Sequence, residues 1–346
     1  MKVLVGMSGG VDSSVAAAMM IDAGYEVAGA TLRLWGGDSD SGCCSVADVD
    51  DARRVAQQLD IPHYVFNFSD EFDERVVAPY VQAHVDGQTP NPCIECNRHL
   101  KFDRFLQRAQ RLGFDAIATG HHVRRVGPRP DGSFALARGE DRAKDQSYVV
   151  HMIAPDVLSK CLFPSGEISK EEVRKRALQL GLRTADKPES MDVCFIAKTG
   201  GGRRVFLGDR VPLRPARVVD KSGTQVGSVD AVELVTIGQR KGLGGAGGSD
   251  KRFVVDVDTN AGVVTVGGHS DLLVPSVALH TVVWGPGSKR SGGFTAQSSA
   301  HGIPAACEFD AATNVATFAE PHVRVAPGQT VVLYEADTVV GGGIAS

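Results

Sequence analysis

Residues 2 to 23 combine a short strand, a glycine turn and a helix, and this unit constrains the fold more than any other part of the chain. Lys2 to Gly6 are largely apolar and rich in β-branched residues, as in a buried parallel strand. An Ala-rich stretch from Asp12 to Ala23 predicts a helix. The turn between them, Ser8-Gly9-Gly10, aims the free amides and the positive end of that helix at one point beyond the strand. Because glycine leaves room for a ligand there, the unit predicts an α/β fold that binds an anion.

The spacing of this turn separates it from two common nucleotide-binding loops. It is not the G-x-x-x-x-G-K-[ST] of a P-loop, and it lacks the third glycine of a dinucleotide fingerprint. It resembles the SGGxDS loop of the PP-loop ATP pyrophosphatases, because Ser8, Gly9, Gly10, Asp12 and Ser13 fall in register. That resemblance implies a grip on the pyrophosphate of ATP and cleavage between its α- and β-phosphates. The alternative is a tight strand-to-helix turn of another α/β protein.

The length and cysteine content narrow the class of protein. A chain of 346 residues is long enough for two or three hydrophobic cores. No run approaches about 18 uninterrupted apolar residues, and no signal-peptide pattern precedes the first strand, so we expect a cytoplasmic protein without a membrane partner. The seven cysteines are too sparse for a disulfide scaffold, so some are expected to be structural and some reactive.

Strands and helices alternate over the first part of the chain, as in a doubly wound parallel sheet. After the first unit, the sequence predicts strands at 27–34, 63–68 and 114–119 and helices at 46–59, 70–84 and 98–112. Ligands of such sheets bind at the carboxyl ends of the strands. Leu32 ends the second strand and Gly120 follows a later one, so both suit contact with an adenosine.

A loop with two prolines, Thr89-Pro90-Asn91-Pro92, leads to the pair Cys93 and Cys96. Cys96 stands just before the helix expected at 98–112. The positive end of a helix lowers the pKa of a thiol beside it, so Cys96 is the better nucleophile candidate.

Two interpretations of the cysteines stay open from the residues alone. A Cys-x-x-Cys pair can be half of a zinc site, and Cys43 and Cys44 can complete a set of four. Cys194 begins a short apolar run, which by itself predicts a core cysteine.

The net charge of −4 is unevenly distributed along the chain. Residues 98–148 hold eleven Lys and Arg against six Asp and Glu, and residues 199–268 hold ten against seven. Local basic surface, more than net charge, attracts a phosphate backbone within a Debye length of about 8–10 Å. Solvated basic faces are the alternative explanation of this pattern.

Seven motifs in order make the resemblance specific. They are SGGVDSS at 8–14, TPNPCIECN at 89–97, KFD at 101–103, ATGHH at 118–122, KDQSY at 144–148, ESMDVCFI at 189–196 and TIGQRKGLG at 236–244. The chain is similar to the tRNA-specific 2-thiouridylases up to about residue 270. The resemblance implies a PP-loop domain of the adenine nucleotide α-hydrolase type over 1–198, a small central β-rich domain over 199–270 and a C-terminal β-barrel over 271–346.

The sequence beyond residue 199 agrees with that expectation in its pattern. Short β-branched runs with turns replace the helices. Runs at 279–284, 294–298, 306–309, 315–318 and 331–334 predict a barrel of five or six strands. Residues 296–301 hold neither the Arg nor the Tyr that the family often has in the strand facing tRNA, so we expect most phosphate contact from the first two domains.

The resemblance also implies the roles of individual residues. The cysteine at position 96 is the nucleophile and Cys194 carries a persulfide, while Asp12 orients magnesium or the nucleotide. The implied ATP contacts are Gly6, Met7, Ser8, Gly9, Gly10, Val11, Asp12, Ser13, Leu32 and Gly120. The implied tRNA contacts are His121, Lys144, Asp145, Gln146 and Gln329. No resident metal ion is expected beyond the Mg²⁺ that accompanies ATP.

The implied reaction is ATP-dependent 2-thiolation of the wobble uridine in the anticodons of tRNAs of the Lys, Glu and Gln types. Adenylation turns the C2 oxygen into a good leaving group, and sulfur arrives as a persulfide on Cys194. Cys96 is the resolving thiol: it cleaves the persulfide S–S bond, and a Cys96–Cys194 disulfide remains. The partners are therefore tRNA, a persulfide donor such as a cysteine desulfurase or sulfur-relay protein, and a reductant.

Three alternatives remain. Cys93, Cys96 and Cys194 can hold an iron–sulfur cluster that delivers sulfide for the same thiolation. Another PP-loop ligase or amidotransferase would need neither Cys96 nor Cys194. A noncatalytic RNA-binding protein would release no AMP or pyrophosphate in the presence of tRNA.

Overall fold

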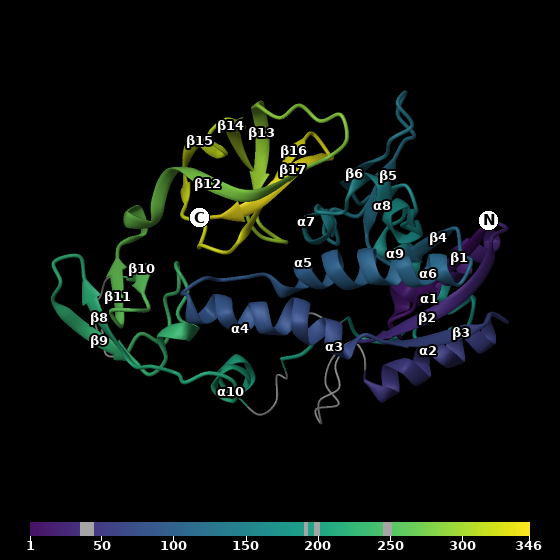
Figure 1. Cartoon of the computed structure of the whole chain (residues 1–346), viewed down its shortest axis with the longest axis horizontal. Helices are drawn as coiled ribbons and strands as arrows, with labels where there is room; N and C mark the ends of the chain where they lie inside the picture. The colour runs from purple at the N-terminus through teal and green to yellow at the C-terminus, as the bar shows by residue number, and fades with distance from the viewer. Residues whose placement is uncertain (35–44, 190–192, 197–200, 245–250) are drawn as a thin grey trace.

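A computed structural model describes residues 1–34, 45–189, 193–196, 201–244 and 251–346 in three parts (Figure 1). A parallel sheet with its helices comes first, a four-stranded domain second and a closed barrel last. Figure 1 places the barrel above the long helices that leave the parallel sheet, with the small domain at their far end. The described residues contain no helix long and apolar enough to cross a membrane.

Five parallel strands in the order β3-β2-β1-β4-β7 form the first sheet. They are β1 (Lys2–Gly6), β2 (Glu26–Arg33), β3 (His63–Asn67), β4 (Ala116–Thr119) and β7 (Cys161–Leu162). Val3 and Val5 of β1 pack into one hydrophobic cluster, and Leu4 between them packs into another. Both faces of the sheet are therefore covered, and the predicted doubly wound parallel sheet is confirmed.

Three helices cover one face of this sheet with small apolar side chains. They are α1 (Val11–Asp22), α2 (Val46–Gln58) and α9 (Lys170–Gln179). The expected bounds of the first helix, 12–23, differ from the observed ones by one residue at each end, and those of the second, 46–59, by one residue at the C-terminal end. The helix α6 (Phe105–Arg111) contributes to the cluster on the other face.

Two long helical segments run from the sheet toward the small domain (Figure 1). The first joins α3 (Ser69–Phe72), the π-helical η1 (Asp73–Val77) and α4 (Ala78–Val85) without a break. The second joins α5 (Pro92–Cys96), the π-helical η2 (Asn97–Arg104) and α6.

The start of the second segment differs from the expected one. It begins at Pro92, whereas the expected helix began at Arg98. The Asn91 side chain caps the helix by accepting a hydrogen bond from the Cys93 amide at 3.1 Å, and proline fits the first helical position because its missing N–H has no intrahelical partner there. Cys96 is thus the fifth residue of the helix rather than its threshold.

Short elements connect the sheet to the barrel. The antiparallel hairpin of β5 (Val123–Val126) and β6 (Ala135–Arg138) pairs with the last barrel strand through Ala137 and Thr338. It is followed by α7 (Ser147–Val150), α8 (Pro155–Leu158) and the 3₁₀ helix η3 (Pro164–Glu167).

The small domain has its own apolar core around Val218, Val254 and Val264. Its strands run in the order β10-β11-β8-β9. After α10 (Gly202–Gly208) come β8 (Ala216–Asp220), β9 (Gln225–Val229), η4 (Val232–Leu234), β10 (Phe253–Asp258), β11 (Val263–Gly267) and η5 (His269–Leu272).

The C-terminal strands close into a six-stranded barrel, because β12 pairs with both β15 and β17. They are β12 (Leu273–Trp284), β13 (Gly292–Gln297), β14 (Ala305–Asp310), β15 (Val315–Val323), β16 (Thr330–Glu335) and β17 (Thr338–Ala345). Five of these strands match the predicted runs. No run was predicted at β17, whose Gly341 to Gly343 weaken the strand pattern. Glycine suits this seam because a Cβ on Gly341 would lie 2.7 Å from the Val283 carbonyl oxygen.

Candidate active site

The turn after β1 and the end of β4 each hold a glycine that no other residue can replace. Gly9 has φ +73°, and a Cβ there would lie 2.3 Å from the carbonyl oxygen of Asp48. Gly120, directly after β4, approaches the start of α1 so closely that its Cβ would lie 2.6 Å from the Ser13 amide nitrogen. The predicted loop and Gly120 therefore meet at the carboxyl end of the sheet.

The start of α1 is built to leave its amides available. Gly10 is the N-cap and provides no side-chain cap. The Ser8 amide donates to Ser13 Oγ at 3.1 Å, and the hydroxyls of Ser13 and Ser14 donate to the Gly10 carbonyl oxygen. The serines thus fix the turn, while the first amides of a 12-residue helix point beyond the strand, where an anion binds.

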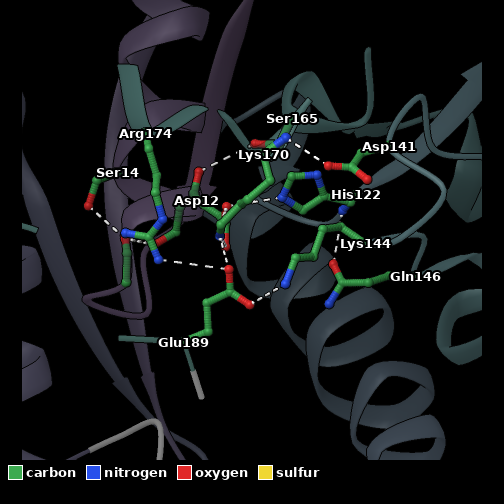
Figure 2. Close-up of polar contacts among 12 residues, drawn as sticks. Asp12, Ser14, His122, Asp141, Lys144, Gln146, Ser165, Lys170, Arg174 and Glu189 are labelled. Carbon is green, nitrogen blue, oxygen red and sulfur yellow. Dashed lines mark hydrogen bonds and ion pairs between the residues drawn. The ribbon is translucent and has the colours of Figure 1, made fainter. Parts of the chain in front are cut away.

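Asp12, in the first turn of α1, is the centre of a charged network (Figure 2). Lys170 Nζ donates to both of its carboxylate oxygens, at 2.6 and 2.7 Å, and His122 Nε2 donates to Oδ1 at 3.0 Å. Burial by itself raises the pKa of the Asp12 carboxyl, but the hydrogen bonds from His122 and Lys170 outweigh burial and lower it. Asp12 is therefore held ionised.

Glu189 extends this network to the segment that leads to Cys194 (Figure 2). It accepts from Lys144 at 2.8 Å and from Lys170 at 3.2 Å, and Arg174 lies 3.8 Å away. The hydrogen bond from Lys144 lowers the pKa of the Glu189 carboxyl against the smaller effect of burial. Three cations against two carboxylates leave the network around Asp12 and Glu189 with a net positive charge, which suits a phosphate ligand.

The two histidines of the ATGHH motif have different surroundings. His122 is buried, and its Nδ1 has no hydrogen-bond partner among the described residues. His121 lies 2.8 Å from Thr119 Oγ1 through Nδ1, and its ring packs 5.5 Å from Phe102. Burial, with the nearby charge of Lys101, lowers the pKa of His121 well below its usual value. His121 is therefore neutral near pH 7.

The residues predicted to contact tRNA are only partly brought together. Lys144 belongs to the Glu189 network, and Gln146 Oε1 accepts from the His122 amide at 2.9 Å. Asp145 is buried and accepts from Arg138, from the Ser147 hydroxyl and from two backbone amides. Gln329 lies in the turn before β16, next to Thr330, whose carbonyl oxygen accepts a hydrogen bond from Tyr148 of the KDQSY motif at 2.9 Å.

The predicted nucleophile Cys96 and the predicted persulfide carrier Cys194 pack against one large apolar cluster. Cys96 is buried in it, and the half-buried Cys194 lies against it. The ring of Phe195 lies 5.5 Å from that of Tyr80. Burial raises the pKa of Tyr80 against the opposing effect of Arg203, and the nearby Cys93 adds a smaller increase. The segment with Cys194 therefore lies beside the helices that carry Tyr80 and Cys93. Cys43 and Cys44, which the zinc alternative needs, lie outside the described residues.

Leu32 occupies the expected position near the carboxyl end of β2 and is partly buried. Lys170, Arg174 and Glu189 were not predicted as parts of the charged network. Glu189 is the first residue of the motif ESMDVCFI. That motif indicates that the segment around Cys194 is functional, but it does not indicate which residues Glu189 pairs with. Nothing around Lys170 in the sequence indicates that it meets Asp12, because 158 positions separate them.

Family models match almost the whole chain. The model described as tRNA methyl transferase HUP domain matches residues 1–198. The tRNA methyl transferase PRC-barrel domain matches 204–268, and the aminomethyltransferase beta-barrel domain matches 277–345. The first model alone covers more than half of the chain.

Full-length relatives agree with these models. The tRNA-specific 2-thiouridylase MnmA of Carboxydothermus hydrogenoformans is 41% identical, over 99% of this chain and 96% of that protein. The protein of that name from Mycolicibacterium paratuberculosis is 44% identical, over 97% and 95%. A solved 4-thiouridine synthetase–RNA complex with bound ATP matches with a TM-score of 0.38 and 17% identity, over 56% of this chain and 44% of that one. The chain belongs to the family of tRNA-specific 2-thiouridylases.

Proposed function

We propose that this protein is a tRNA-uridine 2-sulfurtransferase that thiolates C2 of the wobble uridine, cleaving ATP to AMP and pyrophosphate. We expect its substrates to be tRNAs of the Lys, Glu and Gln types, and we expect it to act in the cytoplasm. The observation that carries the proposal is the glycine-lined turn at the start of α1, whose free amides and neighbouring cations suit a polyphosphate. Family membership supports the choice of tRNA as the substrate.

The first step is adenylation of the uridine. The C2 oxygen bonds to the α-phosphorus of ATP while the bond from that phosphorus to the α–β bridging oxygen breaks, and pyrophosphate leaves. The amides at the start of α1, with Lys170 and Lys144 nearby, stabilise the charge that develops on the phosphates. The uridine must leave the anticodon stack, at a cost of a few kcal/mol that contacts to the flipped base offset.

The second step transfers sulfur. The terminal sulfur of a persulfide on Cys194 attacks C2, and AMP leaves with the former C2 oxygen. The Cys96 thiolate then attacks Sγ of Cys194, the S–S bond to the transferred sulfur breaks, and 2-thiouridine is released. A Cys96–Cys194 disulfide remains, which a two-electron reductant must open.

The described residues suit the phosphates of ATP better than they suit a protein-held magnesium ion or an iron–sulfur cluster. Lys170 donates to both oxygens of Asp12, and its positive charge opposes a second cation at the same carboxylate. We expect magnesium to come with the triphosphate and assign it no step. In the described part of the chain, no three His, Cys, Asp or Glu side chains converge as a metal site, so the iron–sulfur alternative on Cys93, Cys96 and Cys194 is not favoured.

The test measures both products of one turnover. Protein loaded with persulfide by a cysteine desulfurase or relay protein is mixed with ATP and unmodified tRNA. AMP and pyrophosphate should form in equal amounts with 2-thiouridine, detected by mass spectrometry of nucleosides. Release of ADP and phosphate would contradict the adenylation step. Transfer of ammonia or an amino acid to a small molecule would favour another ligase, and tRNA binding without AMP release would favour a noncatalytic RNA-binding protein.

A further inference from the structure

A series of hydrogen bonds begins at Tyr334 on β16, on the face of that strand that packs against the first domain. Its side chain is fully buried, and its hydroxyl lies 3.0 Å from Ser147 Oγ. Ser147 gives its own proton to Asp145 Oδ2 at 2.7 Å, so the Tyr334 hydroxyl must be the donor to Ser147. Burial raises the pKa of Tyr334 to about 12, so this hydroxyl keeps its proton near pH 7.

The same bonds fix the residue that lies between Asp145 and Ser147. Asp145 Oδ1 accepts from the Ser147 amide at 3.1 Å, which closes the turn around Gln146. Gln146 makes two hydrogen bonds to the backbone of His122, both at 2.9 Å. Its side-chain Oε1 accepts from the His122 N–H, and its backbone N–H donates to the His122 carbonyl oxygen.

The path ends at the nucleotide loop. His122 Nε2 donates to Asp12 Oδ1 at 3.0 Å, in the first turn of α1 (Figure 2). His122 is buried and Nε2 is its one ring nitrogen with a partner among the described residues, so the placement of its backbone sets the direction of this bond.

Other contacts dock the barrel without touching this path. Tyr148 donates from its hydroxyl to the carbonyl oxygens of Ser298 and Thr330, at 3.1 and 2.9 Å. Arg142 pairs with Asp337, next to the strand pairing of β17 with β6. The Tyr334 hydroxyl therefore contacts the Ser147 side chain on this path, whereas the Tyr148 hydroxyl, from the same KDQSY motif, contacts backbone carbonyl oxygens of the barrel.

We propose that Tyr334 is a positioning residue for the nucleotide site, through which the C-terminal barrel sets the orientation of Asp12 and thereby the affinity for ATP. Ser147, Gln146 and His122 carry the effect. This inference rests on the proposed function, because it takes ATP as the ligand of the loop at the start of α1. It gives the barrel a role in the ATP-dependent step in addition to any contact with tRNA.

The experiment compares ATP affinity in single-hydroxyl variants of the full chain. Tyr334→Phe removes the donor but keeps the ring under Arg138, whose guanidinium carbon lies 3.7 Å from the ring centroid. We expect its Kd for ATP, measured by calorimetric titration without tRNA, to rise about three- to tenfold, as for one lost hydrogen bond. Ser147→Ala should weaken binding to the same extent. The double variant should be no weaker than either single variant, because both act on one path.

Tyr148→Phe is the matched control. It also removes a buried tyrosine hydroxyl between the domains, so its thermal midpoint should fall at least as far as that of Tyr334→Phe, while its Kd for ATP stays unchanged. Equal weakening of ATP binding in Tyr148→Phe would overturn the inference in favour of general domain docking. Unchanged affinity in both Tyr334→Phe and Ser147→Ala would overturn it while leaving the proposed function intact. A wild-type protein that binds no ATP would overturn both.

Discussion

Lys170 donates to both carboxylate oxygens of Asp12 from a helix that begins 158 positions later in the chain. The same ammonium group contacts Glu189 at 3.2 Å, so one cation holds two carboxylates from two other segments. The side chain of Lys170 is 10% exposed and those of Asp12 and Glu189 are 30% and 25% exposed, so solvent screens these pairs incompletely. These two ion pairs link α1, α9 and the segment before Cys194, in addition to the apolar packing of α1 against α9.

Removing that shared cation should destabilise the fold. Lys170→Met leaves Asp12 and Glu189 without their common partner, and we expect the free energy of unfolding to fall by about 2–3 kcal/mol. Lys175→Met is the control on the same helix, because Lys175 is exposed and pairs with Glu172 at 3.8 Å, which is worth under about 0.5 kcal/mol. Urea titration at pH 7 measures both changes. Equal losses in the two variants would show that the Lys170 pairs contribute no more than a surface pair.

The same carboxylates give stability a defined pH dependence. The pKa values of Asp12 and Glu189 are lowered from ordinary values of 3.8 and 4.5, so the folded state binds protons less readily than the unfolded chain. Their contribution is fully present above those ordinary values and is lost as pH falls through the lowered ones. We expect Glu189→Gln to give a shallower decline of unfolding free energy below about pH 4.5 than the wild type, by urea titration between pH 3 and 7. An identical pH profile would contradict the lowered pKa of Glu189.

Gly9 and Gly24 have similar backbone angles but different surroundings, so substituting each one distinguishes the cost of a steric clash from the cost of a left-handed φ. Gly9 has φ +73° and Gly24 has φ +79°, but a Cβ on Gly9 would lie within 3 Å of backbone atoms, whereas a Cβ on Gly24 would have nothing within 4 Å. Gly24→Ala should cost about 1 kcal/mol, the ordinary cost of a left-handed angle. Gly9→Ala should cost at least about 3 kcal/mol and abolish ATP binding, because it must displace Asp48. Calorimetric ATP titration and urea unfolding of both variants check this; retained ATP affinity in Gly9→Ala would refute the tight-turn assignment.

Cys93 and Cys96 of α5 and Cys194 of segment 193–196 distinguish the two sulfur chemistries. In the persulfide route, Cys96→Ser and Cys194→Ser should each lose thiolation by a factor of about 10³ or more, the scale for removal of a covalent catalyst. Cys93→Ser should keep most activity, because Cys93 takes no part in the sulfur transfer. The measurement is single-turnover formation of 2-thiouridine by iron-free protein loaded with persulfide. Loss of product in Cys93→Ser, together with product from anaerobic iron-loaded wild type, would restore the cluster route.

The sequence by itself determined the parallel-sheet unit and its ligand edge. Local signals suffice for β1, the Ser8-Gly9-Gly10 turn and α1, because a strand, a glycine turn and a helix form within 21 residues and leave the same amides open in any such fold. The cap by Asn91 was equally local but was missed, since prolines at 90 and 92 were interpreted as a loop. Cys96 therefore lies inside a helix, and its proximity to the positive helix end is less than expected.

Only the tertiary structure decided what surrounds Asp12. Lys170 and His122 reach it from two other segments, and Glu189 joins through Lys170 from a third, so the pairing depends on how α9 and the motif after β4 pack against α1. Likewise, Ser147, two positions after the buried Asp145, meets Tyr334 of the barrel across 187 positions. No local pattern encodes such contacts, because hydrophobic burial brings the segments together first and the polar side chains then find partners in the space that remains.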